Sequence, residues 1–164
     1  MKTKDLAKAT KIKLLILDVD GVLTDGKLYY SREGESLKVF HVHDGAGIKQ
    51  LLKQGIHIAV ISARSSAAVQ TRLNELGVKH IYQGQTDKTI AFHELCQKLK
   101  VSPNECAYVG DDLADIAVMK LVALPIAVAN AVLEVKAAAL YVTEMRGGEG
   151  AVREVCELIL ANQS

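Results

Sequence analysis

Tryptophan is absent from this 164-residue sequence, and Phe, Trp and Tyr together make up only 4% of it. So few aromatic side chains argue against a base-stacking platform for single-stranded nucleic acid. Neither sign of charge is in excess, because 20 Lys and Arg residues face 19 Asp and Glu residues. A chain so close to neutrality lacks the basic field that attracts nucleic acid or anionic lipid. We therefore expect neither nucleic acid nor a membrane among its partners.

Long hydrophobic runs and clustered cysteines are also missing. No run reaches the roughly 20 apolar residues that a membrane-spanning helix needs. The polar, lysine-rich start at residues 1–11 lacks the apolar region of a secretory signal. Cys96, Cys106 and Cys156 are too few and too scattered for a disulfide framework or a zinc cluster. We expect buried thiols in a cytoplasmic protein.

The sequence does contain a regular alternation of short apolar runs and longer amphipathic runs. The apolar runs predict β-strands at residues 12–17, 57–61, 80–82, 106–109, 126–128 and 140–142. The amphipathic runs predict helices at 47–53, 65–76, 88–100, 113–122, 132–138 and 151–160. Such an alternation builds a mostly parallel sheet with helices on both faces. We predict a doubly wound, Rossmann-like α/β fold that comprises residues 1–164 as a single domain.

Residues 27–41 interrupt this alternation. Two β-prone runs, 27–30 and 37–41, flank the polar segment 31–35, which is typical of a β-hairpin. The apolar and aromatic side chains on it are Leu28, Tyr29, Tyr30, Leu37, Val39 and Phe40. Because an isolated hairpin is only marginally stable in water, we expect this surface to pack against another subunit of a homo-oligomer. Packing onto its own domain is the alternative.

Polar residues gather where the predicted strands end, which is where open α/β sheets bind their ligands. Asp18 and Asp20 follow the first strand, Ser62 the second, Lys88 the third, and Asp111 the fourth. Two carboxylates about 4 Å apart repel by roughly 4 kcal/mol at an effective dielectric of 20. A hard divalent cation bound by oxygen ligands removes that cost. The pattern therefore predicts a Mg²⁺ site rather than a set of polar turns.

The same segments occur in the order of four motifs of a known superfamily. Asp18-x-Asp20-Gly-Val-Leu-Thr-Asp, Ser62, Lys88 and Gly110-Asp111-Asp112-x-x-Asp115 resemble the haloacid dehalogenase-like phosphatases. The hairpin, one helix and one strand fill the interval between Asp20 and Ser62, so no room is left for a large cap domain, as in the capless branch. Matches at Gly84-Gln85-x-x-Lys88 and in the glycine-rich tail, about 146–164, extend the resemblance to phosphatases of 3-deoxy-D-manno-octulosonate 8-phosphate.

This resemblance implies a Mg²⁺-dependent phosphomonoesterase of lipopolysaccharide precursor synthesis. It implies that Asp18 attacks phosphorus to form an aspartyl-phosphate, while Asp20 acts first as general acid and then as general base. Asp18, Asp111 and the backbone carbonyl of Asp20 would hold Mg²⁺. Ser62 and Lys88 would bind the phosphoryl oxygens. Asp112 and Asp115 would orient Lys88 and the loop around it.

An acidic sugar phosphate requires a second group that binds anions. Arg64 and Arg72 lie roughly on one face of a predicted helix. In the resembled family, the positions that match residues 41–45, Lys49, Arg64 and Arg72 contact substrate. The expected substrate-binding set is therefore Asp20, His41, Val42, His43, Asp44, Gly45, Lys49, Arg64, Arg72 and Lys88. The resemblance also implies a tetramer in which the glycine-rich tail reaches into a neighbour's active site.

Three residues depart from the family pattern. His43 and Glu149 stand where basic residues are expected, and Asn130 stands where Asp is expected. These departures leave a nine-carbon, sialic-type sugar acid 9-phosphate as a close alternative substrate. A phospho-Asp receiver domain is an alternative of another class, but it carries its phosphoacceptor on the third strand. A catalytically idle scaffold is a third possibility, which the intact set of four motifs argues against.

Overall fold

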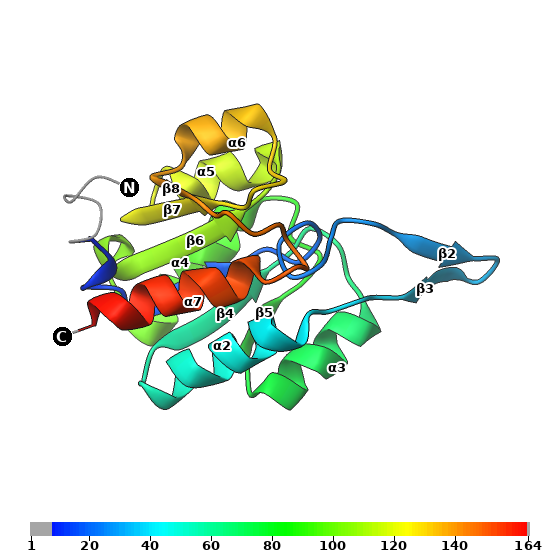
Figure 1. Cartoon of the computed structure of the whole chain (residues 1–164), viewed down its shortest axis with the longest axis horizontal. Helices are drawn as coiled ribbons and strands as arrows, with labels where there is room; N and C mark the ends of the chain where they lie inside the picture. The colour runs from blue at the N-terminus through cyan, green and yellow to red at the C-terminus, as the bar shows by residue number, and fades with distance from the viewer. Residues whose placement is uncertain (1–7, 164) are drawn as a thin grey trace.

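The computed structural model describes residues 8–163 (Figure 1). The polar N-terminal stretch, interpreted above as lacking a secretory signal, lies mostly outside these residues. Among the helices of the described part, none has the length and the apolar character needed to cross a bilayer.

Six strands form the central sheet in the order β5-β4-β1-β6-β7-β8, and every neighbouring pair is parallel. Their bounds are β1 Leu14–Leu17, β4 His57–Ile61, β5 His80–Tyr82, β6 Cys106–Gly110, β7 Leu124–Ala127 and β8 Tyr141–Val142. The strand order reverses direction at β1, because β4 and β5 lie on one side of it and β6 lies on the other. Ligands bind at such a switch point. The predicted α/β fold is confirmed.

Helices cover both faces of this sheet (Figure 1). On one face α2 packs against α3 and α7, and on the other α5 packs against α4 and α6. Their bounds are α2 Val42–Lys53, α3 Ala67–Leu76, α4 Lys88–Leu99, α5 Ile116–Met119, α6 Leu133–Ala138 and α7 Ala151–Asn162. Because both faces are covered, all four residues of β1 are buried.

Two helices differ from their predicted bounds by more than two residues, each because of a local cap. α2 begins at Val42 rather than at residue 47, and the side chain of His41 accepts a hydrogen bond from the backbone N–H of His43 at its start. The helix predicted at 113–122 is divided into α5 and a preceding 3₁₀ turn, η2 (Leu113–Asp115). A reciprocal capping box between Asp112 and Asp115 tightens that turn. A second 3₁₀ turn, η1 (Pro103–Glu105), precedes β6.

The predicted hairpin is present and projects from the body of the molecule (Figure 1). It pairs β2 (Tyr29–Ser31) with β3 (Gly34–Leu37) in an antiparallel ladder. The second strand therefore lies earlier than the predicted 37–41, because the chain after Leu37 leaves the ladder and runs into α2. Apolar side chains on this arm remain open to solvent, including Tyr30 at 61% and Val39 at 55% exposure.

All three cysteines are buried and free, which confirms the prediction of buried thiols. The sulfur atoms of Cys96 and Cys106 lie 3.9 Å apart. Burial raises the pKa of each of these thiols above its ordinary value, so both stay protonated at neutral pH.

Candidate active site

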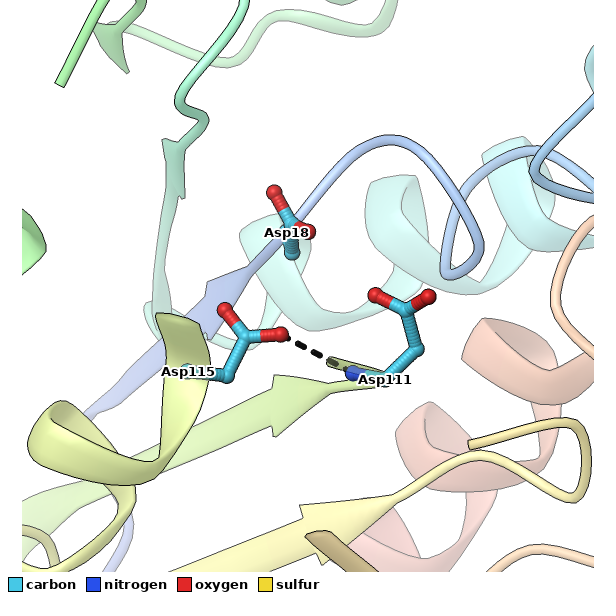
Figure 2. A group of neighbouring side chains, drawn as sticks. All are labelled: Asp18, Asp111 and Asp115. Atoms are coloured by element: carbon cyan, nitrogen blue, oxygen red, sulfur yellow. Dashed lines mark hydrogen bonds between the residues drawn. The ribbon is translucent and has the colours of Figure 1, made fainter. Parts of the chain in front are cut away.

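Asp18 and Asp111 meet where β1 and β6 end (Figure 2). The parallel register pairs Leu17 with Val109, and the backbone N–H of Asp18 donates to the carbonyl of Val109 at 3.1 Å. Asp115, at the end of η2, adds a third carboxylate. One carboxylate oxygen from each of the three lies within 4.8 Å of the others. Figure 2 shows these carboxyl groups around a common space, although they come from two separate parts of the chain.

Asp115 has partners for both of its oxygens, and its side chain is 1% exposed. Oδ1 accepts hydrogen bonds from the hydroxyl of Tyr108 at 2.6 Å and from Nζ of Lys88 at 2.7 Å. Oδ2 accepts from the backbone N–H of Asp111 at 2.9 Å and from that of Asp112 at 3.2 Å. Asp115 therefore holds Lys88 and the loop that carries Asp111 in place.

Asp111 has an oxygen, Oδ1, that is buried and has no hydrogen-bond partner within the described part of the chain. A buried acceptor without a donor is uncommon in proteins, and an oxygen-ligated cation would satisfy it. Gly21 keeps the neighbouring space open: a Cβ at this residue, whose φ is +90°, would lie 2.0 Å from Oδ2 of Asp111. Asp18 and Asp111 therefore fit a small, hard cation such as Mg²⁺.

The charges in this cluster raise two carboxyl pKa values. Burial, together with the nearby Asp115, raises the pKa of Asp18 to about 6, although Lys88 opposes the shift. Burial and the carboxylates of Asp18 and Asp115 raise the pKa of Asp111 to about 8. Both shifts show that this pocket disfavours its own negative charge, which a bound cation would relieve.

Lys88 and Ser62 come to the same place from two other strand ends. Lys88 is the first residue of α4, and its Nζ lies 2.9 Å from Oδ1 of Asp18. Ser62 follows β4 and is 3% exposed. A cavity of about 250 Å³ opens here, and the polar residues that line it are Asp18, Asp20, Ser62, Arg64, Lys88, Asp111, Asp112 and Asp115. The four predicted motifs thus share one cavity.

Two hairpin residues that sequence reasoning missed also reach this region. Lys38 contacts Oδ1 of Asp20, and Glu35 accepts a hydrogen bond from Arg64 at 2.9 Å. Arg64 also donates to the hydroxyl of Tyr30 at 2.9 Å. Burial opposes ionisation of Glu35, but hydrogen bonds from Ser66, Arg64 and Lys38 hold its pKa below the ordinary value. Charged residues on a hairpin are usually solvated, so nothing in the local sequence indicated that Lys38 and Glu35 contact Asp20 and Arg64.

The other predicted substrate residues do not line this cavity in a single copy of the chain; they are His41, Val42, His43, Asp44, Gly45, Lys49 and Arg72. Asp44 is engaged elsewhere, because its Oδ1 accepts a hydrogen bond from the backbone N–H of Arg153 at 2.8 Å and so caps α7. His41 and His43 line a separate cavity, together with Arg153 and Glu149. Lys49 is exposed on α2.

Asn130, one of the departures from the family pattern, joins two segments of the site. Its side-chain amide donates to the carbonyl of Gly21 at 3.0 Å, and its oxygen accepts from the backbone N–H of Gly147 at 2.6 Å. An ionised Asp could accept the second bond but could not donate the first. The start of the glycine-rich tail thus packs on its own Asp20–Gly26 loop, where a Cβ on Gly147 would lie 1.7 Å from the carbonyl oxygen of Gly21.

Comparison with known proteins supports a relationship over nearly the whole chain. A family model described as haloacid dehalogenase-like hydrolase matches residues 78–155. The 3-deoxy-D-manno-octulosonate 8-phosphate phosphatase of Escherichia coli (strain K12) is 51% identical over 158 residues, which covers 96% of this chain and 84% of the relative.

Solved structures agree with this relationship. The crystal structure of 3-deoxy-D-manno-octulosonate 8-phosphate phosphatase from Yersinia pestis matches with a TM-score of 0.97 at 47% identity, covering 99% of this chain and 88% of that one. The enzyme from Moraxella catarrhalis, in complex with magnesium ion, phosphate ion and KDO molecule, matches with a TM-score of 0.96 at 45% identity over 99% and 94% of the two chains. The chain therefore belongs to the 3-deoxy-D-manno-octulosonate 8-phosphate phosphatase family of haloacid dehalogenase-like hydrolases.

Proposed function

We propose that this protein is a Mg²⁺-dependent phosphomonoesterase that hydrolyses 3-deoxy-D-manno-octulosonate 8-phosphate to the free sugar acid and phosphate. The observation that carries the proposal is the convergence of Asp18, Lys88 and Asp111 in one cavity, in a chain about half identical to phosphatases of that substrate. The free sugar acid would enter lipopolysaccharide precursor synthesis in the cytoplasm.

The mechanism follows from the placement of these side chains. Lys88 and Ser62 hold the phosphoryl oxygens and turn phosphorus toward Asp18. A carboxylate oxygen of Asp18 attacks phosphorus, and the bond from phosphorus to the sugar oxygen breaks as Asp20 gives that oxygen its proton. Asp20 then takes a proton from water, which attacks phosphorus of the aspartyl-phosphate and frees both Asp18 and phosphate.

The cation site proposed for this chain consists of Asp18, Asp111 and the backbone carbonyl of Asp20. Mg²⁺ in this site would neutralise charge on the phosphoryl group and on the carboxylates around it. Asp115 keeps Lys88 next to Asp18 throughout, and Asp112 caps η2 at the rim of the cavity. Each polar residue of the four motifs that lines the cavity thereby has a distinct part in the proposed reaction.

Mg²⁺ binding should release protons at neutral pH. The pKa of Asp111 is raised to about 8, so this carboxyl is mostly protonated at pH 7 in the metal-free protein and must lose its proton to become a ligand. We expect Mg²⁺ affinity to rise by up to about tenfold per pH unit from pH 6 to 8 and to level off above that range. Isothermal titration calorimetry in two buffers of different ionisation enthalpy counts the protons, and a binding enthalpy that does not depend on the buffer would contradict this expectation.

Arg64 is the residue best placed to recognise the sugar carboxylate, because it lines the cavity and its side chain is 40% exposed. Replacing it with Met should raise KM for the sugar-acid phosphate by about tenfold or more, the usual cost of a lost charged hydrogen bond. KM for neutral hexose phosphates should change little. Arg32→Met, on the exposed hairpin turn, is the control.

A panel of eight-carbon and nine-carbon acid phosphates, assayed with the unaltered protein, tests the identity of the substrate. Equal rates on neutral hexose phosphates would contradict a preference for acidic sugar phosphates.

We further propose that the single-domain chain forms a homotetramer. The hairpin exposes Leu28, Tyr30, Leu37 and Val39, and a second copy would remove this surface from water. Residues 41–45, Lys49 and Arg72 lie outside the cavity of their own chain. In an oligomer they could instead lie next to the cavity of a neighbouring copy. Sedimentation equilibrium measures the number of copies, and a monomer at micromolar concentration would contradict this assembly.

A further inference from the structure

Lys38 is a buried charged side chain that the mechanism above does not use. It follows β3 directly, and its side chain is 2% exposed although its neighbours Leu37 and Val39 are 47% and 55% exposed. Its ammonium group contacts Oδ1 of Asp20 and lies 3.2 Å from Oε2 of Glu35. Because an unpaired buried ammonium is very costly, these two carboxylates determine where Lys38 can lie.

Asp20, Glu35, Lys38 and Arg64 form a closed ring in which positive and negative charges alternate. Asp20 contacts Lys38 and lies 3.4 Å from Nε of Arg64, whereas Glu35 lies 3.2 Å from Lys38 and 2.9 Å from Arg64. Each acidic side chain of the ring therefore lies between two basic side chains. Only Asp20 and Arg64 of these four line the cavity, so Lys38 acts on the cavity through Asp20.

We propose that Lys38 is a positioning residue that holds the carboxyl group of Asp20 at the cavity, in the orientation from which Asp20 protonates the departing sugar oxygen. The inference rests on the proposed function, because that function assigns proton transfer to Asp20. A general acid must lie within hydrogen-bond reach of the oxygen that it protonates, and a free side chain would divide its time among several rotamers. Lys38 anchors one carboxylate oxygen of Asp20 from outside the cavity, which restricts that freedom.

The choice of leaving group separates this role from a purely structural one. A sugar alkoxide is a poor leaving group and needs a proton as it departs, whereas 4-nitrophenolate departs readily without one. Misplacing Asp20 should therefore slow the sugar phosphate much more than the aryl phosphate. The comparison uses kcat/KM, which reports only the steps up to departure of the leaving group, so later hydrolysis of the aspartyl-phosphate does not affect it.

The test compares Lys38→Met with the unaltered protein on 3-deoxy-D-manno-octulosonate 8-phosphate and on 4-nitrophenyl phosphate, both with Mg²⁺. We expect kcat/KM to fall by about 30-fold or more on the sugar phosphate, part of the 10²–10⁴ that a general acid supplies, and by less than about threefold on the aryl phosphate. Lys38→Arg should recover part of the loss on the sugar phosphate. Lys27→Met is the matched control, because Lys27 is 74% exposed and pairs with Asp25 at 3.1 Å.

An equal fall on both phosphates, or no fall on either, would overturn the role of Lys38. If Lys38→Met does not fold, Glu35→Gln replaces it in the test, because Glu35 is the other partner of Lys38 and lies outside the cavity. We expect a smaller change in the same direction from Glu35→Gln, and an equal loss on both phosphates would again overturn the inference. If the unaltered protein hydrolyses neither phosphate, the proposed function fails, and the role of Lys38 fails with it.

Discussion

Asp18→Asn should abolish Mg²⁺-dependent hydrolysis of both sugar and aryl phosphates. The amide cannot form the covalent bond to phosphorus, and it weakens the cation site because a charged oxygen ligand is lost. We expect kcat to fall by at least about a thousandfold, since removal of a nucleophile eliminates the covalent route altogether. Colorimetric measurement of phosphate release gives this number directly.

A matched control for this substitution lies in the same loop. Asp25 also has an ionised carboxylate, but this carboxylate pairs with the backbone N–H and the ammonium group of the nearby Lys27, and Asp25 does not line the cavity. Asp25→Asn should therefore leave kcat within about twofold, as expected of a surface substitution away from the site. Turnover that survives in Asp18→Asn at the unaltered rate would exclude Asp18 as the nucleophile.

The convergence of Asp18 and Asp111 could be predicted because it depends on strand direction alone. The carboxyl ends of parallel strands meet at one edge of the sheet, so residues that directly follow β1 and β6 must be neighbours once the strands pair. Lys88 could be placed for the same reason, because it begins the helix that follows β5. The positions of Asp18, Lys88 and Asp111 could therefore be predicted without knowing how side chains distant in the sequence pack together.

The contacts of Lys38 and Glu35 could not be predicted in this way. The direction in which a hairpin leaves a sheet depends on the loop before it, and here that loop turns at Gly21 and Gly26, whose φ angles are +90° and +85°. Sequence indicates that a glycine permits such angles, but not which way the chain then runs. The sequence pattern therefore predicts an exposed Lys38, whereas its side chain is buried in the structure.

Asp44 illustrates the same limit for a residue expected to bind substrate. In sequence it is an acidic residue that follows two histidines, and the resemblance alone suggested its role. In the structure it is 2% exposed and caps a helix 109 positions further along the chain. A partner so distant leaves no local signal. The N-cap residue of α7 is Gly150, which has no side chain with which to cap the helix.

Asp115→Asn should damage both the fold and the catalytic site. All four groups that face its carboxylate are donors, namely Tyr108, Lys88 and the backbone N–H groups of Asp111 and Asp112. An Asn side chain would turn its own donor toward one of these pairs, whichever way it rotates. Breaking a buried charge pair in this manner costs about 3 kcal/mol or more. Urea unfolding of the metal-free protein measures that loss.

Relief of charge repulsion opposes this cost, because Asp115 raises the pKa values of Asp18 and Asp111. At pH 7 the relief comes from Asp18, since Asp111 is already mostly protonated there. It is partial, because Lys88 still faces Asp18, whereas the donors around residue 115 remain unsatisfied. Asp87→Asn is the control: Asp87 caps α4 one residue before Lys88, and Asn caps a helix about as well as Asp, so its effect should stay below about 0.5 kcal/mol. Equal stability of the Asp115→Asn and Asp87→Asn variants would show that Asp115 does not hold the site together.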